Sequence, residues 1–113
     1  MKEIKAYIKS HKLNEITSAL HKLERLSGMS VVNVRGFGRS RGKDAHNRFV
    51  EELVDYVPHV KIEIVCLDDM VNQIVSIIKE HAHTGLRGDG KIYISSVDEA
   101  IRIETGETGD HAV

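Results

Sequence analysis

Two segments of this sequence carry an apolar residue at every second position, and this alternation constrains the fold more than any other feature. In residues 3–9 isoleucine and alanine recur with period two, and residues 59–67 repeat the pattern with valine, isoleucine and cysteine. Successive side chains of a strand point to opposite faces, so each segment predicts a half-buried strand. An apolar stripe at three- and four-residue spacing follows each strand and predicts a helix. The two stripes consist of Leu13, Ile16, Leu20, Leu23 and Leu26, and of Val71, Ile74, Val75, Ile78 and Ala82.

Two further strands complete the pattern, at residues 30–37 and 91–97. The first is rich in β-branched residues, which favour strands. Asp68 and Asp69 are expected to cap the second helix, and a last extended segment is expected at residues 101–104. The order predicts a ferredoxin-like α+β fold of βαββαβ type, with a four-stranded antiparallel sheet and two helices on one of its faces.

Helices on one side leave the second face of the sheet to water or to a partner. We assign one apolar residue of each strand to this face, namely Tyr7, Val31, Val65 and Tyr93. Sheet faces of several copies are therefore expected to pack against each other in a closed, cyclic homo-oligomer. Clefts between the copies are natural ligand sites.

The composition predicts one cytoplasmic domain, residues 1–113. A formal net charge of −1 gives no general attraction to nucleic acid, and 4% aromatic residues without tryptophan offer few platforms for stacking bases. We expect no nucleic-acid partner. No apolar run is long enough to span a bilayer, and the first residues do not form a signal peptide. The single cysteine, Cys66, lies in an apolar run and is expected to be a small buried side chain.

Residues 38–57 form a polar connection that is too long for an ordinary turn. They mix arginine and lysine with aspartate and glutamate and show no apolar period before Leu53. Connections of this length inside a compact domain are usually functional, so residues 38–56 are expected to protrude and to bind a partner. Residues 105–113 are polar and predict a mobile C-terminal tail.

Two glycine-rich segments each end in a cation, an arrangement that suits phosphate. In residues 84–91, TGLRGDGK, and 36–39, GFGR, backbone N–H groups can approach an anion while Lys91 and Arg39 add positive charge. Taken singly, each segment is more simply a turn, and neither has the spacing of a P-loop. Together with Arg102, they favour a polyphosphate ligand.

The seven histidines lack the spacing of a metal site. His81 and His83 are two residues apart, so on a helix their side chains would diverge. We expect no metal site within a chain, while a histidine contributed by each copy at a symmetry axis stays an alternative. No nucleophile with a matching base and acid is recognisable, so a binding protein is expected rather than an enzyme.

Four blocks of the chain resemble the PII signal-transduction proteins. Residues 84–94, TGLRGDGKIYI, resemble the C-terminal signature of that family. Residues 34–39, VRGFGR, and 56–65, YVPHVKIEIV, resemble the segments before and after its T-loop, and residues 101–107, IRIETGE, resemble its last strand. The spacing between the blocks also fits, so the likeness covers nearly the whole chain.

This resemblance implies a homotrimer that binds ATP or ADP in clefts between subunits, with magnesium left open. It also implies control of a partner, such as a membrane transporter or a metabolic enzyme, through the T-loop at residues 38–56. The positions that match phosphate contacts are Gly38, Arg39, Gly88, Asp89, Gly90, Lys91 and Arg102. Those that match the adenine and ribose side are Tyr7, Ser30, Glu63 and Val65. The candidate partner contacts in the T-loop are Arg41, Lys43, His46, Arg48, Phe49 and Glu52.

Several positions depart from the nitrogen-regulating members of this family. The glutamine that helps hold the magnesium ion beside 2-oxoglutarate is Ser40 here, and the lysine that pairs with the carboxylate of 2-oxoglutarate is His59. Both changes argue against 2-oxoglutarate sensing. An arginine of the last strand is Glu104, which adds a negative charge near the phosphates. Glu52 stands at the position of the tyrosine that is uridylylated in those members. Residues 41–55 contain no tyrosine, serine or threonine, which excludes uridylylation and hydroxyl phosphorylation there.

The leading hypothesis is a PII-like regulator that reads adenine nucleotides and belongs to a branch specialised in carbon uptake or metal efflux. One alternative is a conventional nitrogen regulator acting on an ammonium transporter, with Arg48 as the arginine that enters the channel. The other is a trimeric, metal-responsive protein of the CutA type, which shares the architecture. Nucleotide binding separates the CutA alternative from the first two.

Overall fold

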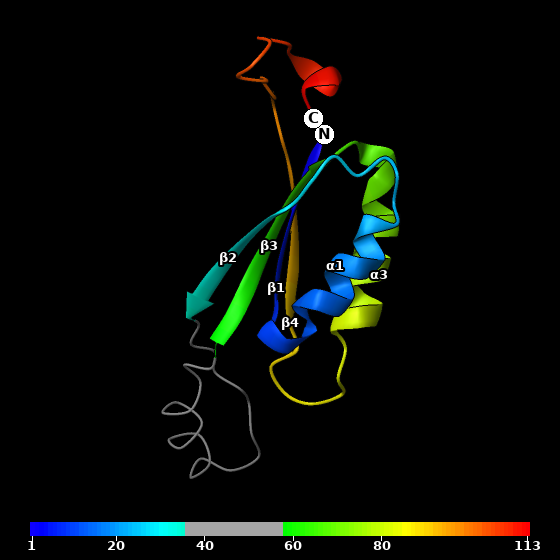
Figure 1. The fold of residues 1–113 in the computed structure, drawn as a ribbon, viewed down its shortest axis with the longest axis vertical. Helices are drawn as coiled ribbons and strands as arrows, with labels where there is room; N and C mark the ends of the chain where they lie inside the picture. The colour runs from blue at the N-terminus through cyan, green and yellow to red at the C-terminus, as the bar shows by residue number, and fades with distance from the viewer. Residues whose placement is uncertain (36–57) are drawn as a thin grey trace.

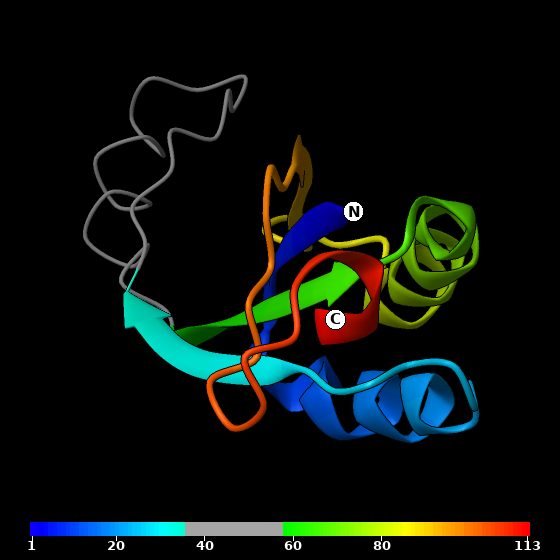
Figure 2. The same ribbon diagram turned by 90° about the horizontal axis from the view of Figure 1, so that it is seen from above.

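The structure of this protein, a computed structural model, describes residues 1–35 and 58–113. Four strands form one antiparallel sheet in the order β2-β3-β1-β4, and helices α1 and α3 both lie on the same side of it (Figures 1 and 2). The predicted ferredoxin-like α+β fold is confirmed. In chain order the elements are β1 (Lys2–Lys9), η1 (Ser10–Lys12), α1 (Leu13–His21), β2 (Ser30–Arg35), β3 (Pro58–Cys66), η2 (Asp68–Met70), α3 (Val71–Ala82), β4 (Gly90–Ser96) and η3 (Gly109–Ala112).

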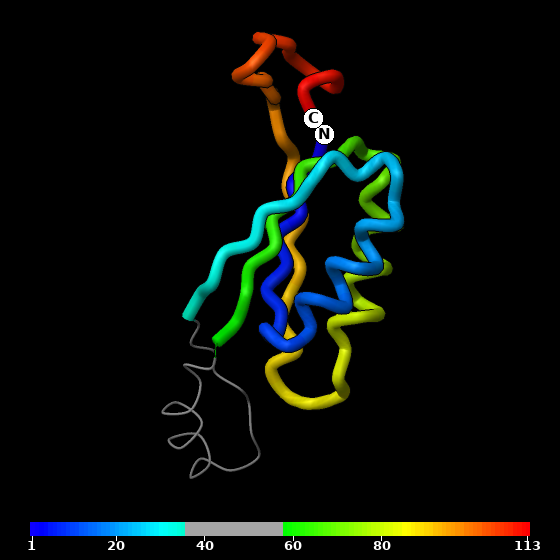
Figure 3. Tube along the Cα trace, viewed as in Figure 1, coloured from blue at the N-terminus to red at the C-terminus, as the bar shows by residue number. Residues whose placement is uncertain are grey.

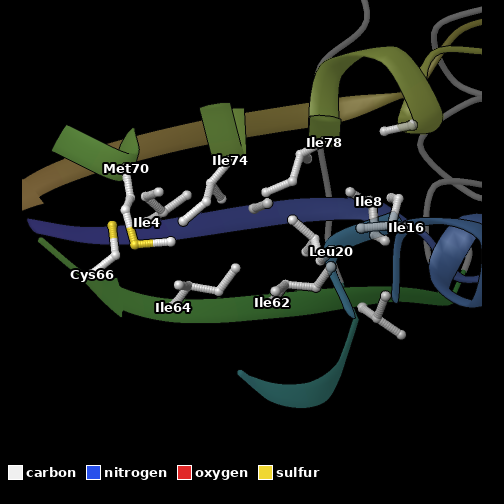
Figure 4. Close-up of a cluster of buried hydrophobic side chains, with 13 residues drawn as sticks. Ile4, Ile8, Ile16, Leu20, Ile62, Ile64, Cys66, Met70, Ile74 and Ile78 are labelled. Atoms are coloured by element: carbon white, nitrogen blue, oxygen red, sulfur yellow. The ribbon is translucent and has the colours of Figure 1, made fainter. Parts of the chain in front are cut away.

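The core lies between the sheet and the two helices and is built from aliphatic and sulfur-containing side chains (Figure 4). Strand β1 lies between β3 and β4, and its register places Ile4 beside Ile64 and Ala6 beside Ile62. Cys66 is buried as predicted, and burial raises the pKa of its thiol. The other buried members of this cluster are Ile8, Ile16, Leu20, Val60, Met70, Ile74, Ile78 and Ala82.

Both predicted apolar stripes face this core, but the first helix is shorter than its stripe. Helix α1 ends at His21. Two turns follow, in which the N–H of Leu23 donates to Leu20 O at 3.0 Å and the N–H of Leu26 donates to Leu23 O at 3.1 Å. Because three-residue spacing suits such turns as well as a helix, Leu23 and Leu26 still pack against the core. None of the described helices is long and apolar enough to cross a membrane.

The predicted capping of the second helix by aspartate is wrong. Helix α3 is preceded by a 3₁₀ turn, and no side chain caps either element. Asp68 instead forms an ion pair with the Met1 amino group at 2.8 Å. Asp69 accepts two hydrogen bonds from the Arg25 guanidinium, at 2.9 and 3.1 Å. Hydrogen bonds from these cations lower the pKa of both carboxyl groups.

The uncovered face of the sheet is partly apolar, as predicted, with one correction. Strand pairing places Val31 beside Ile62, so Val31 lies on the helix side of the sheet, where it is 41% exposed. Val32 takes its place on the open face, since it pairs with Lys61. Strand β2 has valine at consecutive positions, and its alternation therefore does not identify the inner face. Tyr93 also lies on the open face and remains 53% exposed.

The C-terminal residues fold back on themselves instead of forming an extended segment and a loose tail. Ile101 bridges Thr108, and Gly109 N–H donates to Ala100 O at 3.0 Å. The turn between them places Ile103 in solvent, with 99% of its surface exposed. The extended prediction for residues 101–104 is thus wrong beyond its first residues, because the glycines that follow favour a turn.

Ile74→Ala tests the core. Removal of a fully buried side chain leaves a cavity, so the free energy of unfolding should fall by about 2–5 kcal/mol. Urea unfolding followed by circular dichroism measures this loss. Gln73→Ala, which changes the exposed neighbouring position of the same helix, should cost less than about 0.5 kcal/mol. Equal losses for the two variants would contradict the described packing.

Candidate functional site

Residues 84–90, here called the glycine loop, connect α3 to β4 at one end of the sheet (Figure 3). Its glycines have positive φ angles, among them +77° at Gly88 and +109° at Gly90. At Gly90 an added Cβ would lie 1.6 Å from the carbonyl oxygen of Tyr7. No other residue fits there, so the loop enters β4 in close contact with the backbone of β1.

The carboxylate of Asp89 closes the glycine loop from within. It accepts hydrogen bonds from Thr84 N–H at 2.8 Å, from the Thr84 hydroxyl and from Gly85 N–H at 3.2 Å. Led by the Thr84 hydroxyl, these donors hold the pKa of Asp89 well below its usual range. The side chain therefore holds the two ends of the loop together, and the backbone of Asp89 is what it can present to an anion.

Lys9 ties this closed loop to the sheet. From the end of β1 its Nζ reaches Asp89 Oδ1 at 3.2 Å and Thr84 Oγ1 at 3.2 Å, and its side chain is only 17% exposed. Sequence reasoning missed Lys9, because a lysine on the polar face of a strand gives no sign of a partner 75 residues away. The contact also offsets the charge of Asp89, so the loop has no uncompensated negative charge of its own.

Two histidines contact the glycine loop from different elements. At the start of β3, His59 Nε2 lies 3.3 Å from Gly88 O. Just after α3, His83 Nδ1 lies 3.4 Å from Asp89 Oδ2. The sequence analysis considered His83 only as a possible metal ligand and His59 only as a replacement for lysine. The structure places both at the loop.

The predicted nucleotide contacts of the strands share the open face of the sheet. In the register, Tyr7 pairs with Lys91 and Ser30 pairs with Glu63, and the face opposite the helices carries all four. Val65, two residues from Glu63 on β3, lies on the same face. A hydrogen bond from Lys61 at 2.9 Å lowers the pKa of Glu63. The alternation read from the sequence is thus correct for Tyr7 and Val65.

These contacts nevertheless extend across the full width of the sheet. Ser30 is on the edge strand β2 and Lys91 on the edge strand β4, with β3 and β1 between them. Three strand spacings correspond to about 14 Å. Within one chain, Tyr7 therefore lies beside Lys91, whereas Ser30 is too far from Lys91 to share a pocket with it.

Arg102 is also separated from the glycine loop within one chain. It follows β4 in the C-terminal turn, at the opposite end of the sheet from the loop (Figure 3). Its Nη2 donates to the carbonyl oxygen of His111 at 3.4 Å. The exposed Glu104 lies in the same turn. The structure does not bring Lys91 and Arg102 together in a single copy.

The remaining predicted residues lie outside residues 1–35 and 58–113. They are Gly38, Arg39, Ser40, Arg41, Lys43, His46, Arg48, Phe49 and Glu52. The strand ends that flank them are placed, because His59 pairs with Lys9 and Gly90 pairs with Ile8. Segment 36–57 therefore leaves and re-enters the sheet at the same end as the glycine loop.

No group of three or more histidine, cysteine or acidic side chains lies close enough to hold a metal ion in the part of the chain that the structure describes. His81 contacts a carboxylate, since its Nδ1 lies 3.8 Å from Glu15 Oε2, but no third ligand joins them.

Comparisons with known proteins agree on one family. Residues 1–107 match the family model for the nitrogen regulatory protein P-II. Over all 113 residues, and over the full length of each relative, the chain is 49% identical to the nitrogen regulatory protein P-II of Cereibacter sphaeroides. The corresponding identities are 44% for the proteins of the same name from Azospirillum brasilense and Haemophilus influenzae.

Asp89→Asn tests the closure of the loop. We expect the variant to be about 1–3 kcal/mol less stable than wild type at pH 7. An amide carries no negative charge, and its NH₂ group would face the N–H and O–H donors of Thr84 and Gly85. An unfolded aspartate titrates near pH 3.9, above the folded-state pKa of Asp89. The stabilisation is therefore complete above about pH 5 and decreases as the pH falls further.

Urea unfolding at pH 7 and pH 2.5 measures this dependence. The difference between wild type and Asp89→Asn should be smaller at pH 2.5. Asp98→Asn, which changes an exposed aspartate outside the loop, should leave the stability at both pH values nearly unchanged. A difference between Asp89→Asn and wild type that does not vary with pH would show that the charge of Asp89 does not hold the loop.

Proposed function

This chain belongs to the nitrogen regulatory protein P-II family, and we propose that it is a regulator that binds ATP or ADP at the glycine loop. It acts by signalling and not by catalysis. The observation that carries the proposal is the closed glycine loop, which is held by Asp89 and followed directly by Lys91. Such a loop presents backbone N–H groups and a cation to phosphate without first having to become ordered.

The arrangement of charge supports an anionic ligand. Lys9 at the end of β1 pairs with Asp89, so the carboxylate does not repel a phosphate group as an isolated charge would. Arg87 lies within the loop and Lys91 at its end. Tyr7 pairs with Lys91 on the open face and offers an aromatic surface beside the phosphate side of the site.

The separation of the two edges supports a site shared between copies. Ser30 and Glu63 lie toward the β2 edge, and the glycine loop lies at the β4 edge. A homotrimer that places one edge against the other would combine the two half-sites in each of three clefts, and the C-terminal turn with Arg102 would enter from one of the copies. Three clefts of this kind follow from cyclic symmetry.

We further propose that residues 38–56 carry the signal to a partner protein. The strand ends at Arg35 and Pro58 lie at the same end of the sheet as the glycine loop, so a nucleotide there lies beside the base of this segment. Its charged residues suit a polar partner surface on a membrane transporter or a metabolic enzyme, with the regulator itself in the cytoplasm. Membership in the P-II family disfavours the CutA alternative.

Lys91→Ala tests the nucleotide site. We expect the affinity for ATP and for ADP to fall about tenfold or more, because a charged hydrogen bond to phosphate is lost. Isothermal titration calorimetry measures both affinities. Lys79→Ala removes an exposed lysine from α3, on the other side of the sheet, and should bind as wild type does. Absence of binding to wild type below millimolar concentration would overturn the proposal.

The effect of 2-oxoglutarate is a separate test. Ser40 and His59 replace the two residues that matter for this ligand in the nitrogen-regulating members, so we expect 2-oxoglutarate to leave the affinity for magnesium ATP unchanged. Calorimetry with and without 2-oxoglutarate measures this effect. A concentration of about 1 mM suffices, because it equals the upper end of ordinary Michaelis constants. The double variant Ser40→Gln/His59→Lys should gain a response. A clear increase in wild-type affinity would place this chain among the 2-oxoglutarate sensors.

A further inference from the structure

The contacts of His59 and His83 with the glycine loop have no role in the proposed function, yet they place two titratable rings at the site. His83 Nδ1 lies 3.4 Å from Asp89 Oδ2, and His59 Nε2 lies 3.3 Å from Gly88 O. We propose that these two histidines couple nucleotide binding to proton uptake, so that the affinity for ATP and ADP rises as the pH falls from 8 to 6. This inference rests on the proposed function, because it requires a phosphate group at the glycine loop.

The geometry of each contact survives protonation. A carbonyl oxygen only accepts hydrogen bonds, so the ring nitrogen of His59 that faces Gly88 O must carry the hydrogen, and a hydrogen on His83 Nδ1 would likewise suit Asp89 Oδ2. An imidazole that takes up a second proton keeps this N–H and gains a positive charge. Histidine is also the side chain that ordinarily changes charge between pH 5 and 8. Protonation would therefore change the charge of the site and leave the loop in place.

His83 stands over the loop with most of its ring in solvent. Its side chain is 74% exposed, and its Nε2 lies 3.9 Å from the position of a Cβ added at Gly85. The charged group that faces it is Asp89, with Lys9 bound to the same carboxylate. The titratable residues of its own helix nearby are Lys79, Glu80 and His81.

Several described cations lie near His59. Its register partner on β1 is Lys9, and its partner on β2 is the uncharged Val34. The other charged side chains close to it are Lys61 two residues along β3, Arg35 opposite Pro58, and Arg87 beside Gly88 in the loop. A phosphate group bound at the loop would attract a protonated His59 ring.

The sign of the coupling is the same for both rings. The formal charges of Lys9, Arg87, Asp89 and Lys91 sum to +2 with neutral histidines. Protonation of both rings raises it to +4. An anion binds more tightly to the protonated form, so binding must take up protons. An exposed ion pair changes an equilibrium about 1.5- to 5-fold, and two rings together therefore change it about 2- to 25-fold.

Calorimetry at pH 6 and pH 8 with the magnesium complexes of ATP and ADP tests this coupling. The phosphates of the nucleotides titrate as well, but equally for every protein, so the informative quantity is the ratio of affinities at the two pH values. We expect this ratio to be at least about threefold greater for wild type than for His59→Gln/His83→Gln. At pH 7, in buffers of different ionisation enthalpy, wild type should take up more protons than the double variant.

Two further variants separate charge from structure. His21→Gln changes an exposed histidine of α1, away from the loop, and should match wild type at both pH values. His83→Lys has a cation at either pH and should bind more tightly than His83→Gln at pH 8. A pH ratio that is the same for wild type and the double variant would overturn the inference and leave the proposed function intact. If neither nucleotide binds wild type at either pH, both fail.

Discussion

Helices α1 and α3 cover only one face of the sheet, and the face that they leave open carries the proposed nucleotide contacts of the strands. On the covered face, Ile62 and Ile64 exclude water and build the core. On the other face, the same strand presents Glu63, and β1 and β4 present Tyr7 and Lys91. A strand that alternates thus builds the core and the binding surface with one backbone. Substitutions on the open face can therefore change the ligand without loss of the fold.

The glycine loop differs from the rest of this surface, because it is held by charge and not by apolar burial. Asp89 accepts the donors of Thr84 and Gly85, and Lys9 fixes the carboxylate to β1. A loop closed in this way costs little conformational entropy when it binds a ligand. Ser30 lies on the edge strand farthest from the loop, and under the proposed function this residue would complete the site of a neighbouring copy.

Two errors of the sequence analysis arose because a local rule was applied where contacts between distant residues decide the structure. Asp68 and Asp69 occupy positions typical of helix caps, but the amino group of Met1 and the guanidinium of Arg25 bind them instead. Local rules also do not distinguish the two faces of an edge strand with consecutive valines, which is why Val31 was assigned to the wrong face. In each case the missing information was the position of a residue distant in sequence.

The sequence by itself determined the order of strands and helices, the aliphatic core and the glycines of the loop, because period, β-branching and backbone freedom are local properties. Only the tertiary structure decided that Lys9 meets Asp89, since that ion pair depends on the register between β1 and β4 and joins residues at opposite ends of the chain. It also decided that His59 and His83 reach the glycine loop, which no spacing in the sequence indicates. The alternation of side chains along a strand predicts which face of the sheet each one lies on, whereas the partner of a charged side chain depends on the register of the folded sheet.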